Sequence, residues 1–231
     1  MKRVLPLAAL LLIFPTIALA QSDDYKKWEF FGGYSALNFD NLGNDTDIAA
    51  LNDVLSKKNT LRGFNLEVTR NFHKYVGATF DYSLHVRTDD FTRPAGSGSV
   101  DNNVQNFLGG VQIKNNHEDG PTFKPFAHAL FGVAHQRVSI NSPQIPALFG
   151  ISDFRTNETS FAMAFGGGVD IKLNHRFDIR AVQVDWNIIN RGDQQTGVVL
   201  APTPHQTVGS PFVIPGMRQD NLRLGAGIVI H

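Results

Sequence analysis

Ser83 and His85 are the first residues whose types and spacing suggest chemistry, because a hydroxyl near an imidazole can form a nucleophile–base pair. Asp185 would supply the carboxylate that orients such a base. In a strand, Ser83 and His85 would project from the same face, since they are two positions apart. The sequence contains no Gly-x-Ser-x-Gly motif to support a hydrolase. We therefore expect no catalytic residue.

Two other patterns suggest ligand sites. Gly166-Gly167-Gly168 has the composition of a phosphate-binding loop, but no Lys followed by Ser or Thr comes after it, and its flanks have the pattern of a strand. His128 and His135 lie seven positions apart in a segment whose two faces are ambiguous. The glycines fit close packing inside a narrow barrel better than a nucleotide site. We expect no cofactor and no metal ion.

Composition narrows the function classes further. The chain has 231 residues, which is enough for one domain. It carries 21 Lys and Arg against 21 Asp and Glu, so it lacks the basic field of a nucleic-acid-binding protein. The absence of cysteine from the sequence excludes disulfides, thiolate zinc sites, cysteine nucleophiles and a lipidated N-terminal cysteine. Glycine and phenylalanine, at 21 and 18 residues, favour strands and turns.

Residues 1–20 have the pattern of a cleaved signal peptide. Lys2 and Arg3 form a basic start, residues 4–14 form an apolar run, and Ala18-Leu19-Ala20 resembles a cleavage site. The apolar run is too short for a membrane span of about 20 residues. We therefore expect a single mature domain, residues 21–231, outside the cytoplasm.

The mature chain alternates between apolar and small or polar residues with a period of two, which is typical of strands. From Val76 to Val86, for example, the even positions are apolar and the odd positions are small or polar. Eight such segments lie at about 28–38, 61–70, 76–88, 104–114, 122–137, 159–173, 177–189 and 220–231. Either face of 122–137 could point outward, and a change of phase in 177–189 predicts a β-bulge near Ala181.

The connections between these segments alternate between short and long. Residues 71–75, 115–121 and 174–176 are short turns, whereas the long polar loops cover 39–60, 89–103, 138–158 and 190–219. An antiparallel meander then places every long loop at one end. Even strand number, short turns and long loops are the pattern of bacterial outer-membrane barrels. The sequence thus predicts an all-β fold, an eight-stranded antiparallel up-and-down transmembrane β-barrel.

Side-chain size indicates which face points to lipid. The interior of an eight-stranded barrel is only just wide enough for side chains, so the small and charged face fits the lumen. A soluble barrel of lipocalin type would place the bulky face inside and is the alternative. The expected lumenal polar network is Glu67, Asp81, His85, Arg87, Lys114, Asp170, Lys172, Arg180, Asp185 and Arg223. The expected lipid-facing residues are Phe64, Leu66, Val68, Phe80, Tyr82, Leu84, Phe165, Val169, Leu224 and Ile228.

Glycine units led by an aromatic residue or leucine recur along the mature chain. They are Phe31-Gly32-Gly33-Tyr34, Leu108-Gly109-Gly110-Val111, Phe131-Gly132-Val133, Phe165-Gly166-Gly167-Gly168-Val169 and Leu224-Gly225-Ala226-Gly227. The stretch from Gly63 to Asp81, and Arg180 followed by Gln183-Val184-Asp185-Trp186, add two further motifs. Together they resemble the OmpA-like outer-membrane β-barrel superfamily. The end, Ile228-Val229-Ile230-His231, departs from the terminal aromatic residue that assembly machinery reads in many such barrels.

The predicted function is a structural or surface-interaction role in the bacterial outer membrane, without catalysis and without a wide pore. The expected partners are outer-membrane lipid, the barrel-assembly machinery and an extracellular ligand bound by the long loops. We expect the protein to bind no nucleic acid and to be a monomer. The alternatives are a lipid-modifying outer-membrane enzyme, which needs Ser and His at the lipid rim, and a soluble lipid carrier, which needs an empty apolar cavity.

Two loop segments allow more than one structure. Ile48, Leu51 and Leu55 have helical spacing, so residues 47–55 could form a short helix that covers the barrel mouth. We favour an irregular loop. The last long loop carries four prolines and the apolar run 212–214. Those apolar residues would serve either ligand contact or packing on neighbouring loops.

Overall fold

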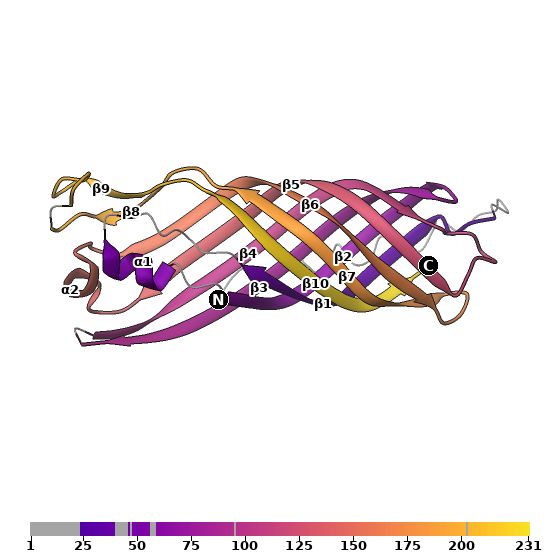
Figure 1. Cartoon of the computed structure of the whole chain (residues 1–231), viewed down its shortest axis with the longest axis horizontal. Coiled ribbons are helices and arrows are strands. Elements are labelled where there is room, and N and C mark those ends of the chain that lie inside the picture. Colours follow the sequence, from indigo (N-terminus) through magenta and orange to yellow (C-terminus); the bar gives the residue numbers. More distant parts are fainter. Residues whose placement is uncertain (1–23, 40–45, 47, 56–58, 95, 202) are drawn as a thin grey trace, which may run out of the picture.

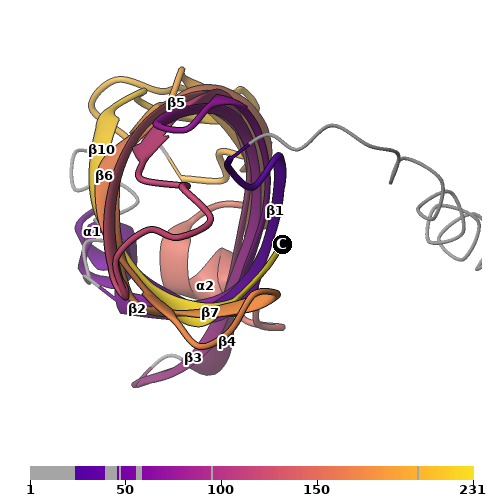
Figure 2. The ribbon, with the colours of Figure 1, turned by 90° about the vertical axis from the view of Figure 1, so that its right-hand side faces the viewer.

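Eight long strands form one closed antiparallel barrel in the computed structural model, which describes residues 24–39, 46, 48–55, 59–94, 96–201 and 203–231 (Figure 1). The strands are β1 (Trp28–Phe39), β2 (Asn59–His73), β3 (Val76–Arg93), β4 (Gly96–Lys114), β5 (Phe123–Asn141), β6 (Phe154–Lys172), β7 (Phe177–Asn190) and β10 (Arg218–Ile230). Figure 2 looks along the barrel and shows the strands closing into a ring. The predicted eight-stranded fold is confirmed. The signal peptide expected at 1–20 lies outside the described residues.

Each strand pairs with its neighbours in the chain, and β1 pairs with β10 to close the barrel. The closing register runs from Phe30 opposite Ile230 to Asn38 opposite Leu222. We call the end with the tight connections β2–β3, β4–β5 and β6–β7 the turn end, and the opposite end the loop end. In Figure 1 the turn end is on the right.

A β-bulge lies at Ala181, as the change of phase predicts. On one side of β7, Val182 faces Val169 while Arg180 faces Asp170. The register against β10 shifts at the same point, so Ala181 is the extra residue. The bulge lets Arg180 point inward although its parity differs from that of Gln183 and Asp185.

The loop end is more regular than the sequence predicts. Residues 89–93 and 96–103 form the ends of β3 and β4, which continue to pair as far as Arg93 opposite Gly96, so the long loop expected at 89–103 is a hairpin. The apolar alternation stops at Thr88 because the outward side chains become polar, whereas backbone pairing continues. The loops expected at 39–60 and 138–158 are likewise shortened by longer strands.

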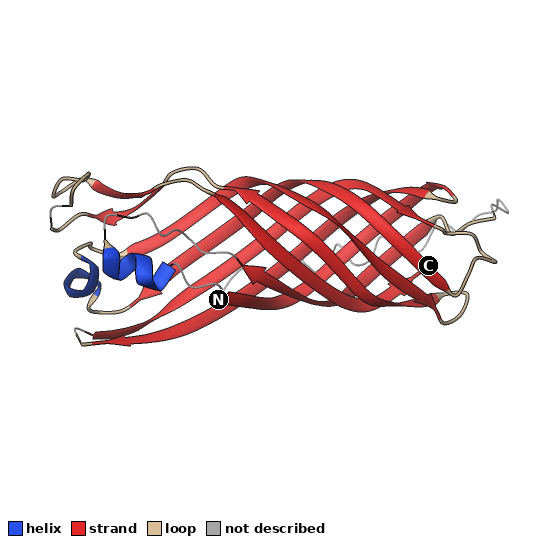
Figure 3. Ribbon diagram, in the orientation of Figure 1, coloured by secondary structure: helices blue, strands red, loops and turns tan. Residues whose placement is uncertain are grey.

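Two helices and a small hairpin cover the loop end. They are α1 (Ala49–Leu55), α2 (Ile145–Phe149), and β8 (Gln194–Val198) paired with β9 (Pro211–Ile214). Figure 3 shows the helices at this end of the barrel. The prediction of an irregular loop over 47–55 is wrong for Ala49–Leu55, because Leu51 and Leu55 are buried when α1 forms, whereas residue 47 lies outside the described residues. None of the helices in the described part of the chain is long and apolar enough to cross a bilayer.

These loop-end elements share an apolar core with the strands. Its members include Leu51 and Leu55 of α1, Phe149 of α2 and Phe212 and Ile214 of β9. The core continues inside the barrel through Leu37, Leu61, Val104, Leu108, Leu130, Ala134, Ala162 and Ala164. We call this assembly the loop-end lobe. The sequence left open whether residues 212–214 contact a ligand or pack on neighbouring loops. Phe212 and Ile214 are buried in the loop-end lobe, so these two residues pack inward.

Candidate functional site

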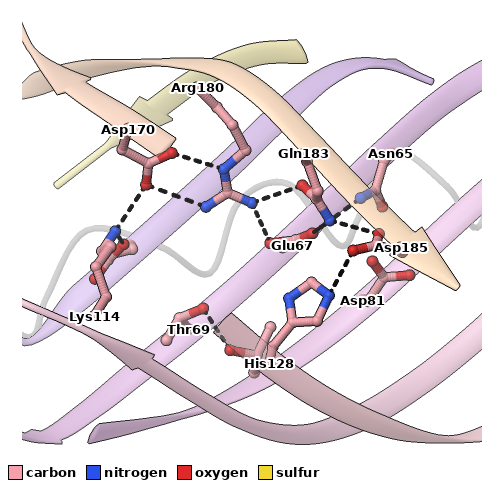
Figure 4. Close-up of polar contacts among 12 residues, drawn as sticks. Asn65, Glu67, Thr69, Asp81, Lys114, His128, Asp170, Arg180, Gln183 and Asp185 are labelled. Atoms are coloured by element: carbon pink, nitrogen blue, oxygen red, sulfur yellow. Dashed lines mark hydrogen bonds and ion pairs between the residues drawn. The ribbon is translucent and has the colours of Figure 1, made fainter. Parts of the chain in front are cut away.

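The turn-end half of the lumen contains a buried network of charged side chains. Arg180 of β7 donates from Nε to Asp170 Oδ1 at 2.8 Å and from Nη1 to Glu67 Oε2 at 2.6 Å (Figure 4). Its guanidinium also lies over the rings of Phe31 and Phe126, 4.3 and 4.1 Å from their centroids. Cation–π contacts with two rings and hydrogen bonds at the edge together replace the water that a buried charge loses.

Arg223 of β10 forms the second centre of this network. It binds Asp81 of β3 with two parallel hydrogen bonds of 2.9 and 2.8 Å, and donates from Nε to Asp185 at 2.8 Å. Asp185 also lies 2.8 Å from His128 Nε2, while Gln183 bridges Asp185 and Glu67. The two arginine centres therefore form one connected network across the lumen.

Two lysines form further buried ion pairs toward the turn end. Lys114 contacts Glu29 and lies 3.0 Å from Asp170, which ties it to the Arg180 centre. Lys124 lies 2.9 Å from Asp178, and His231 Nε2 lies 3.0 Å from the same carboxylate. Sequence reasoning missed Glu29, Lys124, His128, Asp178 and His231 as residues that form ion pairs in the lumen. Glu29 has the same strand parity as Phe31, which could have placed it in the lumen. Lys124 and His128 lie in 122–137, where the sequence does not show which face points inward.

The faces of β5 are resolved by burial. Phe123, Ala127, Phe131 and Val133 are exposed and point outward. The even positions, which include Lys124, Phe126 and His128, are buried in the lumen. Of the two alternatives for this strand, the one with Phe131 and Val133 outside holds.

Three of the predicted lumenal residues differ from the others. Arg87 pairs with Asp89 at 2.6 Å at the loop end and is only half-buried, so it lies outside the charged network. Lys172 donates to the backbone oxygen of Glu118 at the turn end, so the prediction that it belongs to the lumenal network is also wrong. His85 is fully buried but lies 2.8 Å from Ser35 Oγ and belongs to a separate neutral pair. The remaining seven are buried in the lumen: Glu67, Asp81, Lys114, Asp170, Arg180, Asp185 and Arg223.

The lumen is not polar along its whole length. Apolar residues also point inward, and they include Leu37, Leu61, Leu108 and Leu130, each fully buried, beside the buried polar residues Ser35, His85, Asn106, Gln136 and Gln219. The expectation of a small or polar inner face is wrong at these four leucines. The reason is that the loop-end lobe packs α1, α2 and the β8–β9 hairpin against these positions.

All ten residues expected to face lipid project from the outer face of the barrel. Phe80, Leu66 and Ile228 are about half-exposed, at 52%, 47% and 53%. We call the continuous outward surface that contains them the apolar band. Trp28 under Arg70 and Trp186 under Arg218 lie at its two edges, with ring centroids 4.8 and 5.6 Å from the guanidinium carbons. Aromatic residues at both edges of an apolar belt are typical of a barrel in a bilayer.

A smaller polar cluster lies beneath the loop-end lobe. Glu158 of β6 accepts hydrogen bonds from the backbone of Gly192 at 2.8 Å and from Ser160 at 2.7 Å. It also binds Gln194 and lies 3.5 Å from Arg191. Burial lowers the pKa of the Arg191 guanidinium, and the Glu158 carboxylate opposes this effect. The cluster therefore anchors the start of the β8–β9 insertion to the barrel wall.

The residues that suggested a hydrolase are not assembled into one. Ser83 accepts a hydrogen bond from Asn106 at 3.1 Å, while His85 contacts Ser35. Asp185 binds Arg223 and His128 instead of His85. Among the residues that the structure describes, no group of three or more His, Asp or Glu is arranged to hold a metal ion. The chemistry of the lumen is that of ion pairing.

Comparisons with known proteins agree with this architecture. A family model described as "Outer membrane protein beta-barrel domain" matches residues 7–227. The outer membrane protein OprG from Pseudomonas aeruginosa has 12% identity and a TM-score of 0.54, with 90% of this chain and 96% of that chain covered. Ail of Yersinia pestis, solved with sucrose octasulfate, has 14% identity and a TM-score of 0.48, with 88% and 98% covered. No curated protein matches the chain.

Proposed function

The chain belongs to the outer membrane protein β-barrel family and lies in the bacterial outer membrane. From this premise we propose that it is a non-catalytic barrel with a closed lumen, whose loop-end lobe contacts ligands outside the cell. The long-loop end of such barrels is extracellular and the short-turn end is periplasmic. The loop-end lobe is then the part of the molecule available to external partners.

One observation carries the proposal: two different fillings occupy the same lumen in series. The charged network around Arg180 and Arg223 fills the periplasmic half, and the apolar core of the loop-end lobe, together with buried neutral pairs such as Ser35–His85 and Gln136–Gln219, fills the extracellular half. An ion that crosses the barrel would have to break buried ion pairs and then enter a region filled largely by apolar and neutral side chains, and both steps are costly. This arrangement supports a platform and disfavours a diffusion pore.

The outer end of the lobe offers apolar side chains to the surroundings. Val198, Leu200 and Val208, on and after β8, are exposed at 40%, 47% and 58%. An exposed loop carried by a rigid barrel is a common position for binding residues. Ser83 and His85 lie inside the barrel, away from the lipid rim that a lipid-modifying enzyme would use. These facts favour surface interaction over the enzymatic alternative.

Three further features belong to the same proposal. Residues 1–20 are removed as a signal peptide, the barrel-assembly machinery inserts the mature chain, and the barrel acts as a monomer. The apolar band around the barrel contacts the outer-membrane lipid.

Conductance in planar lipid bilayers tests the closed lumen. The purified, refolded protein should give little or no steady current, because the charged network and the apolar core both block the axis. A wide porin inserted in the same membrane provides the positive control. Large, stable single-channel steps from this protein would contradict the proposal.

A further inference from the structure

Above the apolar band, toward the extracellular side, the outward surface of β3 to β6 becomes polar while the sheet continues. Tyr82, Phe107, Val133 and Phe161 are outward neighbours in register on these four strands. Farther out, Leu84 and Val86 of β3 are still apolar, and the other outward positions are polar: Thr88, Asp90, Asp101, Asn103, Gln105, His135, Arg137, Ser139, Arg155, Asn157 and Thr159. In the outer membrane, this level is occupied by the head groups of the outer leaflet.

A shallow groove of about 330 Å³ lies in this polar surface. Its outward-facing lining comes from Val86, Thr88, Asp101, Asn103, Arg137 and Ser139. Asp101 is held by its neighbours, since Thr88 donates to it at 2.6 Å and Asn141 at 2.5 Å. The groove thus presents hydroxyl and amide groups and the Asp101 carboxylate, each of whose oxygens already accepts a hydrogen bond, beside the guanidinium of Arg137. This set suits a saccharide whose hydroxyls meet the polar groups and whose anionic group meets the arginine.

Arg137 and Arg155 provide the positive charge. Arg137 of β5 lies opposite Asn157 of β6, and Arg155 lies opposite Ser139, so the two arginines are diagonal neighbours on adjacent strands. Diagonal neighbours on one face of a sheet are about 7–8 Å apart, within reach of long side chains that converge on one group. Both are exposed, and neither has an ion-pair partner among the described residues. Two guanidinium forks at this separation can hold one phosphate from both sides.

We propose that Arg137, Arg155 and the groove beside them bind the phosphorylated saccharide head of an outer-leaflet glycolipid. The groove is continuous with the apolar band, so one lipid molecule can place its acyl chains on Phe107 and Val133 and its head group on Arg137. This continuity favours a membrane glycolipid over a free phosphate. The site concerns lipid beside the barrel wall and is independent of any ligand bound by the loop-end lobe.

Native mass spectrometry of the detergent-solubilised protein tests this site. The probe is purified lipopolysaccharide with a short saccharide and phosphate groups, compared with the same glycolipid after enzymatic dephosphorylation. Arg137→Gln, Arg155→Gln and the double variant are compared with wild type. Arg218→Gln is the matched control, because it removes an outward arginine of β10 that already pairs with Asp220 at 2.8 Å.

The double variant should bind the phosphorylated glycolipid at least about tenfold more weakly than wild type, and Arg218→Gln should bind it normally. Dephosphorylation should weaken binding to wild type and make little difference to the double variant. Equal affinity of wild type and the double variant, or equal affinity for both glycolipids, would overturn the proposal. Displacement of the glycolipid by an equal concentration of inorganic phosphate would overturn the lipid assignment. If the double variant does not fold, the two single variants decide the result.

Discussion

Arg180 illustrates how a permanent charge is kept inside a narrow barrel. Removal of an ion from water costs several kcal/mol unless hydrogen bonds and opposite charges replace the water. Asp170, Glu67 and Gln183 accept from the guanidinium edge, and the rings of Phe31 and Phe126 make cation–π contacts with it. A lysine would offer neither the fork nor the flat face. Arginine at this position is therefore a requirement of the geometry as well as of the charge.

Residue types predicted much of this network but not its full membership. Charged residues on the small face of a strand have to be paired in the lumen, and this logic identified Arg180, Arg223 and five of their partners or neighbours. It missed Lys124 and His128 because both faces of 122–137 carry apolar residues. It also assigned Arg87 to the lumen from parity alone, although parity does not give height along the barrel axis.

Adjacent positions on β3 test which face meets lipid. Thr79 is buried and its hydroxyl lies 2.8 Å from that of Thr69, whereas Phe80 is 52% exposed. A fluorescent label on Phe80→Cys should be quenched by a lipid-soluble quencher, while the same label on Thr79→Cys should not. The sequence has no native cysteine to interfere. Separately, Phe80→Arg should destabilise the barrel by about 2–4 kcal/mol near the midplane, as measured by denaturant unfolding in lipid. The reverse order of quenching, or equal protection at both positions, would show that the assigned faces are wrong.

At the level of elements, the strands could be predicted where contact with lipid requires apolar outward residues to alternate with inward ones. The parts of the strands beyond the lipid could not be predicted. Between Val76 and Val86 the outward residues must be apolar, so the period of two is visible in the sequence. Beyond Thr88 the outward residues face water or head groups, and the pattern disappears although pairing with β4 continues. Backbone hydrogen bonds leave no mark on side-chain composition, and for this reason the hairpin at 89–103 resembled a loop.

The helix α1 was missed for a related reason. A helix of 7 residues is too short to be stable alone, and it forms here because its apolar side chains are buried in the loop-end lobe. Helical spacing of Leu51 and Leu55 was present in the sequence, but the partners that bury them come from β9, α2 and the barrel wall. Tertiary packing therefore decides the structure of this segment.

Removal of one buried side chain should loosen the loop-end lobe without opening the barrel. Leu51 is fully buried, and Leu51→Ala should cost about 2–5 kcal/mol of lobe stability through the cavity that it leaves. Amide hydrogen exchange should become faster in α1, α2 and the β8–β9 hairpin, and should stay slow in β1 and β10. Ala49→Ser, at an exposed position of the same helix, is the control. Unchanged exchange in the lobe of the Leu51→Ala variant would show that α1 is not packed as described.

The whole molecule is held together by closure. Every strand of the barrel has two paired neighbours, so the sheet has no free edge that can separate first. The β1–β10 seam depends on close approach at glycine: a Cβ atom added at Gly227 would lie 2.3 Å from the backbone oxygen of Gly32. Ala226, the preceding residue, points outward from the same strand and has room to grow. The seam thus offers a matched pair of positions, one of which should control closure of the whole barrel.

Resistance to detergent should follow from closure as a single cooperative property. In micelles, the folded wild type should migrate anomalously on an unheated denaturing gel and normally after boiling, because opening must break many backbone hydrogen bonds together. Gly227→Val should lose the anomalous band, since its side chain collides with the backbone of β1, whereas Ala226→Val should keep it. Identical migration of wild type before and after boiling, together with recovery in a soluble fraction, would contradict a closed barrel in the membrane. If Gly227→Val keeps the folded band, closure of the barrel does not depend on the close approach of β1 and β10 at Gly227.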